Sequence, residues 1–259
     1  MEGIDSSVSA YSIELTWGGK LPSVGDFIWN SGHTPLRARL DNWLLTGMQQ
    51  LHSMLSDSWQ SGFDQAPMWN FIVPASMLGS GCVAGCISPS CDRTGRRFPF
   101  VVTYGLSAQI PASSLSQAVN AIVPGLLSQT GVLLFNGIRR QWPRETLAAL
   151  LQQTLANWEP LLLLPPVEQT DLGAQYDDSV ILDVLKVAND DNDDPALPPT
   201  PDDRFSTLPW SNVAHSLNAG AATSFWWTNG VGGAAMKAFT YGDHLDGALM
   251  TWLFGSSPR

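Results

Sequence analysis

Alternating apolar and polar positions predict the strands of this chain. Near the N-terminus, polar residues separate Tyr11, Ile13, Leu15 and Trp17, which is typical of a strand with one buried face. Similar short runs predict further strands over residues 68–73, 83–87, 98–106 and 222–228. Only a polar turn separates the run that ends at residue 87 from the run that begins at residue 98. These two strands are therefore predicted to form a hairpin.

Apolar residues at three- and four-residue spacing predict a long helix after the first strand. It begins at Pro35, with Thr34 as its cap, and leaves His52 exposed beside the apolar face. That face comprises Leu36, Leu40, Trp43, Leu44, Gly47, Leu51 and Leu55. This is the clearest helix in the sequence.

Three other segments are predicted to be helical. They are residues 114–127, with a kink or break at Pro124, residues 143–158, and residues 244–254 with Asp243 as the cap. Residues 170–188 fit either a helix or a strand. Strands and helices thus follow one another along the chain, which indicates a mixed α/β architecture.

The domain organisation follows from one change in composition. Residues 10–165 are predicted to form an N-terminal core, and residues 166–259 to complete the same α/β unit. Between them, residues 189–203 contain six aspartates and four prolines, which disfavour both helix and sheet. We therefore expect residues 189–203 to form an acidic linker.

Composition and charge exclude several classes of partner. The 259 residues include 44% hydrophobic and only 14% charged residues, and the net charge is −10. This charge argues against binding to nucleic acid or to an anionic membrane surface. No secretory signal is visible in residues 1–12, and the longest purely apolar run is residues 161–164. We therefore expect a cytoplasmic protein without membrane insertion.

The 11 tryptophans suggest a large core. Most of them are expected to be buried, and an exposed cluster would mark a surface for docking another protein. The oligomeric state stays open.

Catalytic and metal-binding patterns are weak. Cys82, Cys86 and Cys91 fit neither a disulfide framework nor a zinc site, and we expect them to pack as small apolar residues in strands. The four histidines are not at the spacing of metal ligands, and Gly79-Ser80-Gly81 lacks the rest of a phosphate-binding loop. The sequence therefore predicts no catalytic residue, no cofactor and no metal.

Two segments, residues 17–27 and 89–100, place glycine, proline and charged residues between bulky apolar ones. This composition favours tight turns that hold side chains in fixed positions. In the first segment, Asp26 follows a glycine and is expected to accept a backbone N–H bond at the turn. The alternative is that Asp26 and Asp92 form a carboxylate pair for acid–base chemistry.

The second segment is the turn of the predicted hairpin. There, Asp92 is expected to pair with a nearby arginine, and Gly95 to supply a positive φ angle. The alternative is that Arg93 and Arg96 project outward to bind a carboxylate or phosphate of a partner.

Together these segments resemble the TagF family of type VI secretion-associated proteins. The matching motifs are Gly-Lys-Leu-Pro-x-x-Gly-Asp-Phe at residues 19–27, Pro-x-Trp-x-Phe at 67–71, Pro-Ser-x-Asp-Arg-x-Gly-Arg-x-Phe-Pro at 89–99, and Ser-x-Trp-Trp at 224–227. Residues 41–44 echo a tryptophan-bearing helix motif of the family. The family-motif residues are Lys20, Pro22, Gly25, Asp26, Phe27, Trp69, Pro89, Ser90, Asp92, Arg93, Gly95, Arg96, Phe98, Pro99, Ser224, Trp226 and Trp227. One departure is Asn70, where the family usually has an arginine.

The resemblance implies both a fold and a function. The implied fold is a three-layer α/β/α sandwich with a mixed, largely antiparallel sheet. The implied function is non-enzymatic: cytoplasmic, post-translational repression of type VI secretion by binding the forkhead-associated scaffold protein. The motif residues would then either bind this partner or support the fold. Two alternatives stay open: a structural component of the secretion apparatus, and a phosphoester hydrolase using Asp26, Asp92 and Arg96.

Overall fold

A seven-stranded antiparallel sheet forms the centre of the computed structural model, which describes residues 13–30, 34–55, 59–79, 81–107, 118–162, 209, 210, 213, 217, 221–242 and 244–255. The strands are β1 (Ile13–Lys20), β2 (Phe27–Trp29), β3 (Trp69–Val73), β4 (Gly81–Ser88), β5 (Phe100–Ser107), β6 (Thr223–Thr228) and β7 (Ala238–Gly242). Their spatial order is β2-β1-β5-β4-β3-β6-β7. Since β6 pairs with β3, the C-terminal part of the chain extends the sheet built by the N-terminal part.

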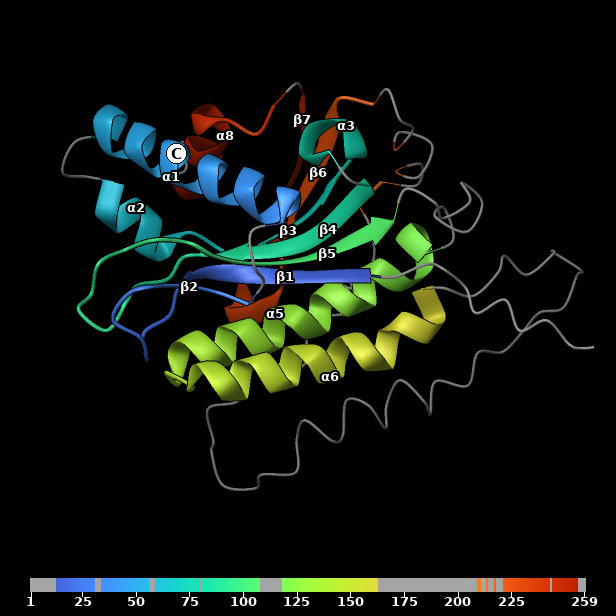
Figure 1. Cartoon of the computed structure of the whole chain (residues 1–259). Helices are drawn as coiled ribbons and strands as arrows, with labels where there is room; N and C mark the ends of the chain where they lie inside the picture. The colour runs from blue at the N-terminus through green and yellow to red at the C-terminus, as the bar shows by residue number, and fades with distance from the viewer. Residues whose placement is uncertain are drawn as a thin grey trace, which may run out of the picture.

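Helices cover both faces of the sheet. They are α1 (Pro35–Leu55), α2 (Trp59–Gln65), α3 (Ala75–Leu78), α5 (Val123–Arg139), α6 (Arg144–Leu162) and α8 (Gly247–Phe254), with a π-helical turn at Ala118–Ile122 and a 3-10 turn at Val231–Gly233. Figure 1 shows α1, α2 and α8 above the sheet and α5 and α6 below it. The predicted α/β sandwich is confirmed, and every pairing among the described strands is antiparallel.

Strand alternation divides the core into two layers. In β3, Trp69, Phe71 and Val73 pack toward α1 and α8, whereas Ile72 packs toward α5 and α6. All eight residues of β4 are buried, as expected for a central strand covered on both faces. Cys82 and Cys86 lie in this strand and pack as small apolar residues, as predicted. For Cys91 the prediction is wrong, because it is half-buried and lies in the turn between β4 and β5, outside the strands.

Several predicted elements are confirmed. The first strand, the long helix, the hairpin of β4 and β5, and the strand near residue 225 all lie where the pattern places them. The amide of Arg37 donates to Thr34 Oγ1 at 3.2 Å, so Thr34 caps α1. Tyr11 and residues 163–208, which include the predicted acidic linker, lie outside the described residues.

Two helix predictions are wrong in detail. The described helical segment does not end at residue 127: α5 continues to Arg139, and Pro124 lies in its first turn. Proline fits there because the first-turn N–H groups have no partner within the helix. At the C-terminus, Asp246 rather than Asp243 caps α8, because its side chain accepts a bond from the Leu249 amide at 2.9 Å.

The sequence pattern missed four short elements. These are β2, α2, α3 and β7, none of which exceeds seven residues. Residues 119–139 are long and apolar enough to cross a membrane by length and composition, but 61% of their most apolar window is buried inside the structure. A helix packed in a core meets the same criterion, so this finding carries little weight.

Candidate functional site

The two motif segments meet in one corner of the molecule, at the β2 edge of the sheet. The first forms the loop between β1 and β2, and the second forms the turn between β4 and β5, at the same end of the sheet in Figure 1. The amide of Arg93 donates to the carbonyl oxygen of Val24 at 2.8 Å. A guanidinium nitrogen of Arg96 donates to the carbonyl oxygen of Gly25 at 2.7 Å. We call residues 20–27 and 89–99 together the motif corner.

Asp92 is the centre of the motif corner. Its Oδ1 accepts bonds from the amide and hydroxyl of Thr94, at 2.9 and 2.7 Å, and from the Arg96 amide at 3.0 Å. Its Oδ2 lies 2.6 Å from Arg96 Nε and 3.0 Å from Lys20 Nζ. The residue is 1% exposed. The expected aspartate–arginine pair is therefore present, and a lysine from the other segment joins it.

These contacts hold Asp92 ionised. Burial by itself would raise the pKa of this carboxyl, but bonds from Thr94, Arg96 and Lys20 outweigh it and lower the pKa well below its usual range. Five donors thus occupy a carboxylate that solvent cannot reach. Such a group fixes the shape of a turn rather than exchanging protons with a substrate.

Lys20 links the buried carboxylate to the surface. Its ammonium pairs with Asp92 and lies 4.8 Å from the centre of the Phe27 ring. Phe27 in turn packs edge-on against Phe98, with ring centres 4.7 Å apart. Phe27 remains 42% exposed. The corner therefore presents an aromatic ring that is held in place from behind by a cation and a buried ring.

Arg93 and Arg96 form the charged part of the corner surface. The side chain of Arg96 is 60% exposed although its Nε binds Asp92. Arg93 is also exposed, and no described residue accepts a bond from its guanidinium, which lies against Gly25. The first alternative is confirmed, because Arg96 pairs with Asp92 and fixes the turn. Both arginines also face outward, and binding of a partner's carboxylate or phosphate by them stays a prediction.

Two glycines allow the corner to form. Gly19 has φ +128°, and a side chain there would collide with the carbonyl oxygen of Pro99. Gly95 has φ +82° with open space around it, which confirms the expected left-handed conformation in the hairpin turn. Both positions favour glycine, the first for lack of space and the second for backbone conformation alone.

The remaining corner residues support this frame. Asp26 is exposed and accepts a bond from the Phe27 amide at 2.8 Å, as the turn chemistry predicted. Pro22 and Pro89 are half-buried, Pro99 is buried, and the Ser90 carbonyl accepts from the Phe98 amide at 3.0 Å. Asp26 makes no bond with Asp92 or Arg96, so the three residues of the hydrolase alternative do not converge.

The other motif residues lie in the core, away from the corner. Trp69 Nε1 donates to the Leu253 carbonyl at 3.1 Å, and Trp226 Nε1 donates to Ser224 Oγ at 2.8 Å. Trp226 and Trp227 are fully buried on opposite faces of β6. These residues join the helix layers to the sheet and offer no surface to a partner.

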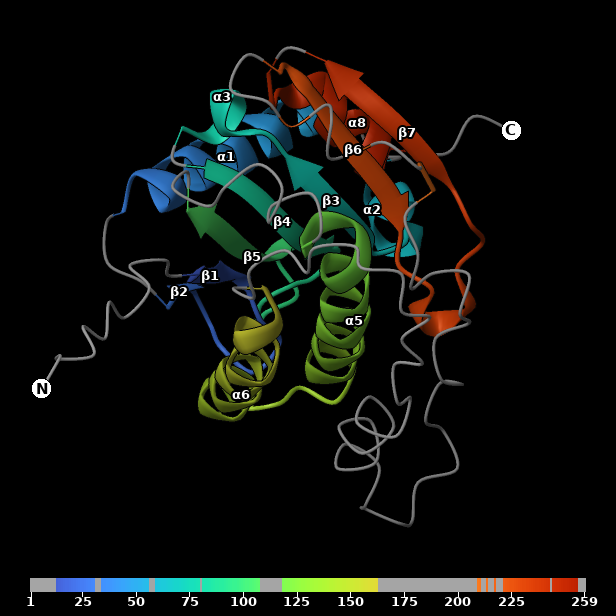
Figure 2. The ribbon, with the colours of Figure 1, turned by 90° about the vertical axis from the view of Figure 1, so that its right-hand side faces the viewer.

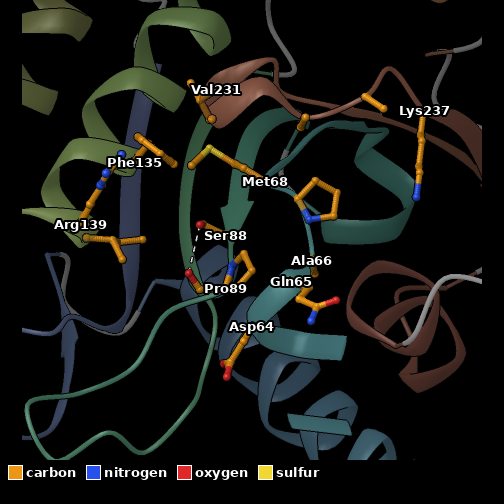
Figure 3. A pocket seen from close by; sticks show the side chains of 15 residues that line it. Asp64, Gln65, Ala66, Met68, Ser88, Pro89, Phe135, Arg139, Val231 and Lys237 are labelled. Carbon is orange, nitrogen blue, oxygen red and sulfur yellow. Dashed lines mark hydrogen bonds between the residues drawn. The ribbon is translucent and has the colours of Figure 1, made fainter. Parts of the chain in front are cut away.

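A hollow lies beside the base of the hairpin. It encloses about 480 Å³ between Pro89, the end of α5 and the loop before β7. Figure 3 shows Phe135 and Arg139 entering from α5, Met68 in the middle and Lys237 on the far side. Asp64 lies on the rim and forms a two-bond ion pair with Arg97, both at 2.7 Å. The hollow is mainly apolar and contains none of the residues that surround Asp92.

The described residues contain no group of three His, Cys, Asp or Glu that could hold a metal ion. Burial raises the pKa of the Cys82 thiol to about 12, and it also raises that of Cys86. A thiol with so high a pKa carries little thiolate and is a poor nucleophile or ligand.

Sequence analysis missed two sets of polar contacts. Thr94 supplies two of the five donors to Asp92, and the Asp-x-Thr spacing of an Asx turn was the signal for it. In the core, Asn70 Oδ1 accepts bonds from Asn229 at 2.9 Å and Cys86 at 3.2 Å, while Asn70 Nδ2 has no partner among the described residues. Asn70 thus takes part in a small buried polar network.

Comparison with known proteins points to one family. Residues 16–161, more than half of the chain, match the family model of the TagF N-terminal domain, described as type VI secretion system-associated. PA0076 from Pseudomonas aeruginosa PAO1 has a similar structure, with a TM-score of 0.58 at 24% sequence identity. The match covers 95% of this chain and 96% of PA0076, and it shows a shared fold. No curated protein matches the chain.

Proposed function

Because this chain belongs to the TagF family of type VI secretion-associated proteins, we propose that it is a non-enzymatic, cytoplasmic repressor of type VI secretion. In this proposal it acts by binding the forkhead-associated scaffold protein of the system. The observation that carries the proposal is the motif corner, where the family motifs build a rigid frame behind an exposed Phe27, Arg93 and Arg96.

The physical chemistry of the corner suits protein binding. Aromatic and arginine side chains are enriched among the residues that dominate binding energy. A surface held rigid before binding loses less conformational entropy when the partner arrives. The net charge of −10 opposes only weakly the approach of a partner's carboxylate or phosphate to Arg93 and Arg96, because physiological salt largely screens exposed charges beyond about 8 Å.

The burial of Asp92 disfavours the hydrolase alternative. A general acid or nucleophile must reach its substrate, whereas Asp92 is 1% exposed and has five donors around it. Turnover of a generic phosphoester that is lost in Asp92→Asn would support the hydrolase instead. A structural role in the apparatus predicts stable co-purification with its assembled components.

The test is binding of the full chain to the purified forkhead-associated scaffold, measured by calorimetry. Wild type should bind, and Arg93→Ala should raise the dissociation constant about tenfold, as expected for a central interface arginine. Arg39→Ala is the matched control, since Arg39 is an exposed arginine on α1 whose guanidinium lies against Gly79, outside the corner. It should bind like wild type.

Two results would overturn the proposal. One is that the chain fails to bind scaffold protein purified from cells, both when the scaffold is used as isolated and after it is treated with a phosphatase. The other is equal affinity of Arg93→Ala, Phe27→Ala and wild type, which would remove the corner from the interface.

A further inference from the structure

β7 ends the sheet with unpaired backbone groups. The Lys237 carbonyl accepts a bond from the Thr228 amide at 2.9 Å, and the Tyr241 carbonyl accepts from Ser224 Oγ at 3.0 Å. Residues 237, 239 and 241 therefore direct their N–H and C=O groups toward β6. In an antiparallel ladder this direction alternates. The backbone groups of Ala238, Thr240 and Gly242 consequently point away from the sheet, and no described residue bonds to them.

Among the described residues, the β7 edge has none of the features that usually prevent strand pairing. Proteins protect an edge with proline, with charged side chains, with a bulge or with a covering segment. β7 reads Ala-Phe-Thr-Tyr-Gly and contains neither proline nor charge. Figure 2 shows it as the outermost strand on its side of the sheet. Its backbone is thus suited to pairing with another extended strand.

Apolar surface accompanies this edge. Trp252 on α8 is 63% exposed, the most exposed of the large apolar side chains that the structure describes, and its ring centre lies 6.0 Å from that of Phe239. Met236, just before β7, is 43% exposed. Beside them lies a hollow of about 530 Å³ whose lining includes Trp69, Phe239 and Leu253. A strand that pairs with β7 would find apolar contacts on the α8 side.

We propose that two copies of this chain pair through β7, antiparallel, about a two-fold axis at Thr240. In this register Thr240 lies opposite its own copy, and Ala238 lies opposite Gly242. Each outward N–H then meets an outward C=O, so the strand is self-complementary, as a two-fold interface requires.

The side chains of β7 favour a second copy as the occupant. In this register the two copies of Thr240 face each other, and the small residues Ala238 and Gly242 face each other on either side. Nothing within β7 repels its copy. The dimer would have one continuous sheet with the two motif corners at its far ends, since β2 and β7 are opposite edges of the sheet. This inference does not depend on the proposed partner.

The test uses substitutions on the two-fold axis. Sedimentation equilibrium of the wild-type chain should show a concentration-dependent dimer. Thr240→Lys and Thr240→Glu each place like charges directly opposite and should each raise the dimer dissociation constant about tenfold. An equimolar mixture of the two variants should form a heterodimer at least as tight as the wild-type dimer, because the opposed charges now attract.

The matched controls are Thr146→Lys and Thr146→Glu, which change an exposed threonine on α6 by the same charges. They should associate like wild type. Near-ultraviolet circular dichroism checks that every variant keeps its tryptophan packing. Thr240→Pro gives a second route, because it removes the outward N–H without removing a bond to β6. It should also weaken the dimer.

A wild-type chain that stays monomeric at every concentration would overturn the inference. So would a dimer that the Thr240 substitutions leave unchanged, since that dimer would use another surface. A mixture of Thr240→Lys and Thr240→Glu that associates no better than either variant alone would exclude the register.

Discussion

At the β2 edge, side chains bond to two of the outward backbone groups, whereas at the β7 edge no described residue bonds to the outward groups. The Trp29 carbonyl accepts a bond from Arg144 at 3.0 Å, and the Phe27 amide donates to Asp26 at 2.8 Å. Nothing among the described residues does the same for Thr240. One sheet thus combines a closed edge and an open edge, and the closed one carries the family motifs.

The two edges also differ in charge. Four arginines surround β2: Arg37 over the Trp29 ring, Arg144 over the Trp17 ring, and Arg93 and Arg96 beside Gly25. The five residues of β7 carry no charge. A partner at β2 would therefore meet fixed side chains, and a partner at β7 would meet backbone. The first kind of surface selects by shape and charge, and the second by hydrogen-bond register.

The largest expected effect is at the closed edge. Asp92→Asn removes the carboxylate that pairs with Lys20 and Arg96, and leaves a 6% exposed lysine without its counter-charge. Breaking a buried pair on one side should lower the free energy of unfolding by about 3 kcal/mol. Urea denaturation at pH 7 measures it. Asp26→Asn, an exposed carboxylate in the same corner, should change it by less than about 0.5 kcal/mol. Equal effects would mean that Asp92 does not organise the corner.

Acid should weaken the same edge selectively. The pKa of Asp92 is lower in the folded than in the unfolded chain, so the carboxylate stabilises the fold fully above its ordinary pKa of about 3.9. That contribution is lost progressively as the pH falls below about 4. Between pH 5 and pH 2 the wild type should therefore lose more stability than Asp92→Asn. Parallel pH profiles of the two proteins would contradict the lowered pKa.

Local chemistry explains why the corner could be predicted from the sequence. The turn at Gly95, the Asp92–Arg96 pair and the bond at Asp26 depend on residues at most four positions apart. The contact of Arg96 with Gly25 spans 71 positions, and no local pattern implies it. The resemblance groups the two segments as motifs of one family, and only the structure shows that they lie side by side.

The parts that were not predicted depend on tertiary contacts. α5 continues past residue 127 although Gly131 and Gly137 lower its helix propensity. A side chain at Gly131 would strike Asn229, and one at Gly137 would crowd Leu147, so both glycines allow close packing that offsets their cost. β2 and β7 are too short for periodicity to stand out, and each is a strand because a longer neighbour pairs with it.

One glycine substitution near each edge separates two effects: the cost of a positive φ angle and the cost of adding an exposed methyl group. Gly95→Ala keeps φ +82° in a residue with a Cβ and should lower the free energy of unfolding by about 1 kcal/mol. Gly242→Ala in β7 meets nothing closer than 3.8 Å and needs no positive φ. It should be neutral within about 0.5 kcal/mol. Thermal unfolding of both variants checks the difference, and a larger loss at Gly242 would reverse the comparison.

Among the substitutions that remove a contact, the smallest effect is expected for Arg144, an exposed residue that bonds to the outer side of β2. Arg144→Ala frees the Trp29 carbonyl and removes a cation from the Trp17 ring. Arg144 itself is exposed, so each contact should contribute at most about 1 kcal/mol. Water can replace the lost bond. Arg144 also begins α6, where a positive charge opposes the helix dipole, so its removal returns about 0.3 kcal/mol or more. The net loss should be about 0.5 kcal/mol in urea denaturation. A loss as large as that of Asp92→Asn would show that Arg144, rather than the buried carboxylate, holds the β2 edge together.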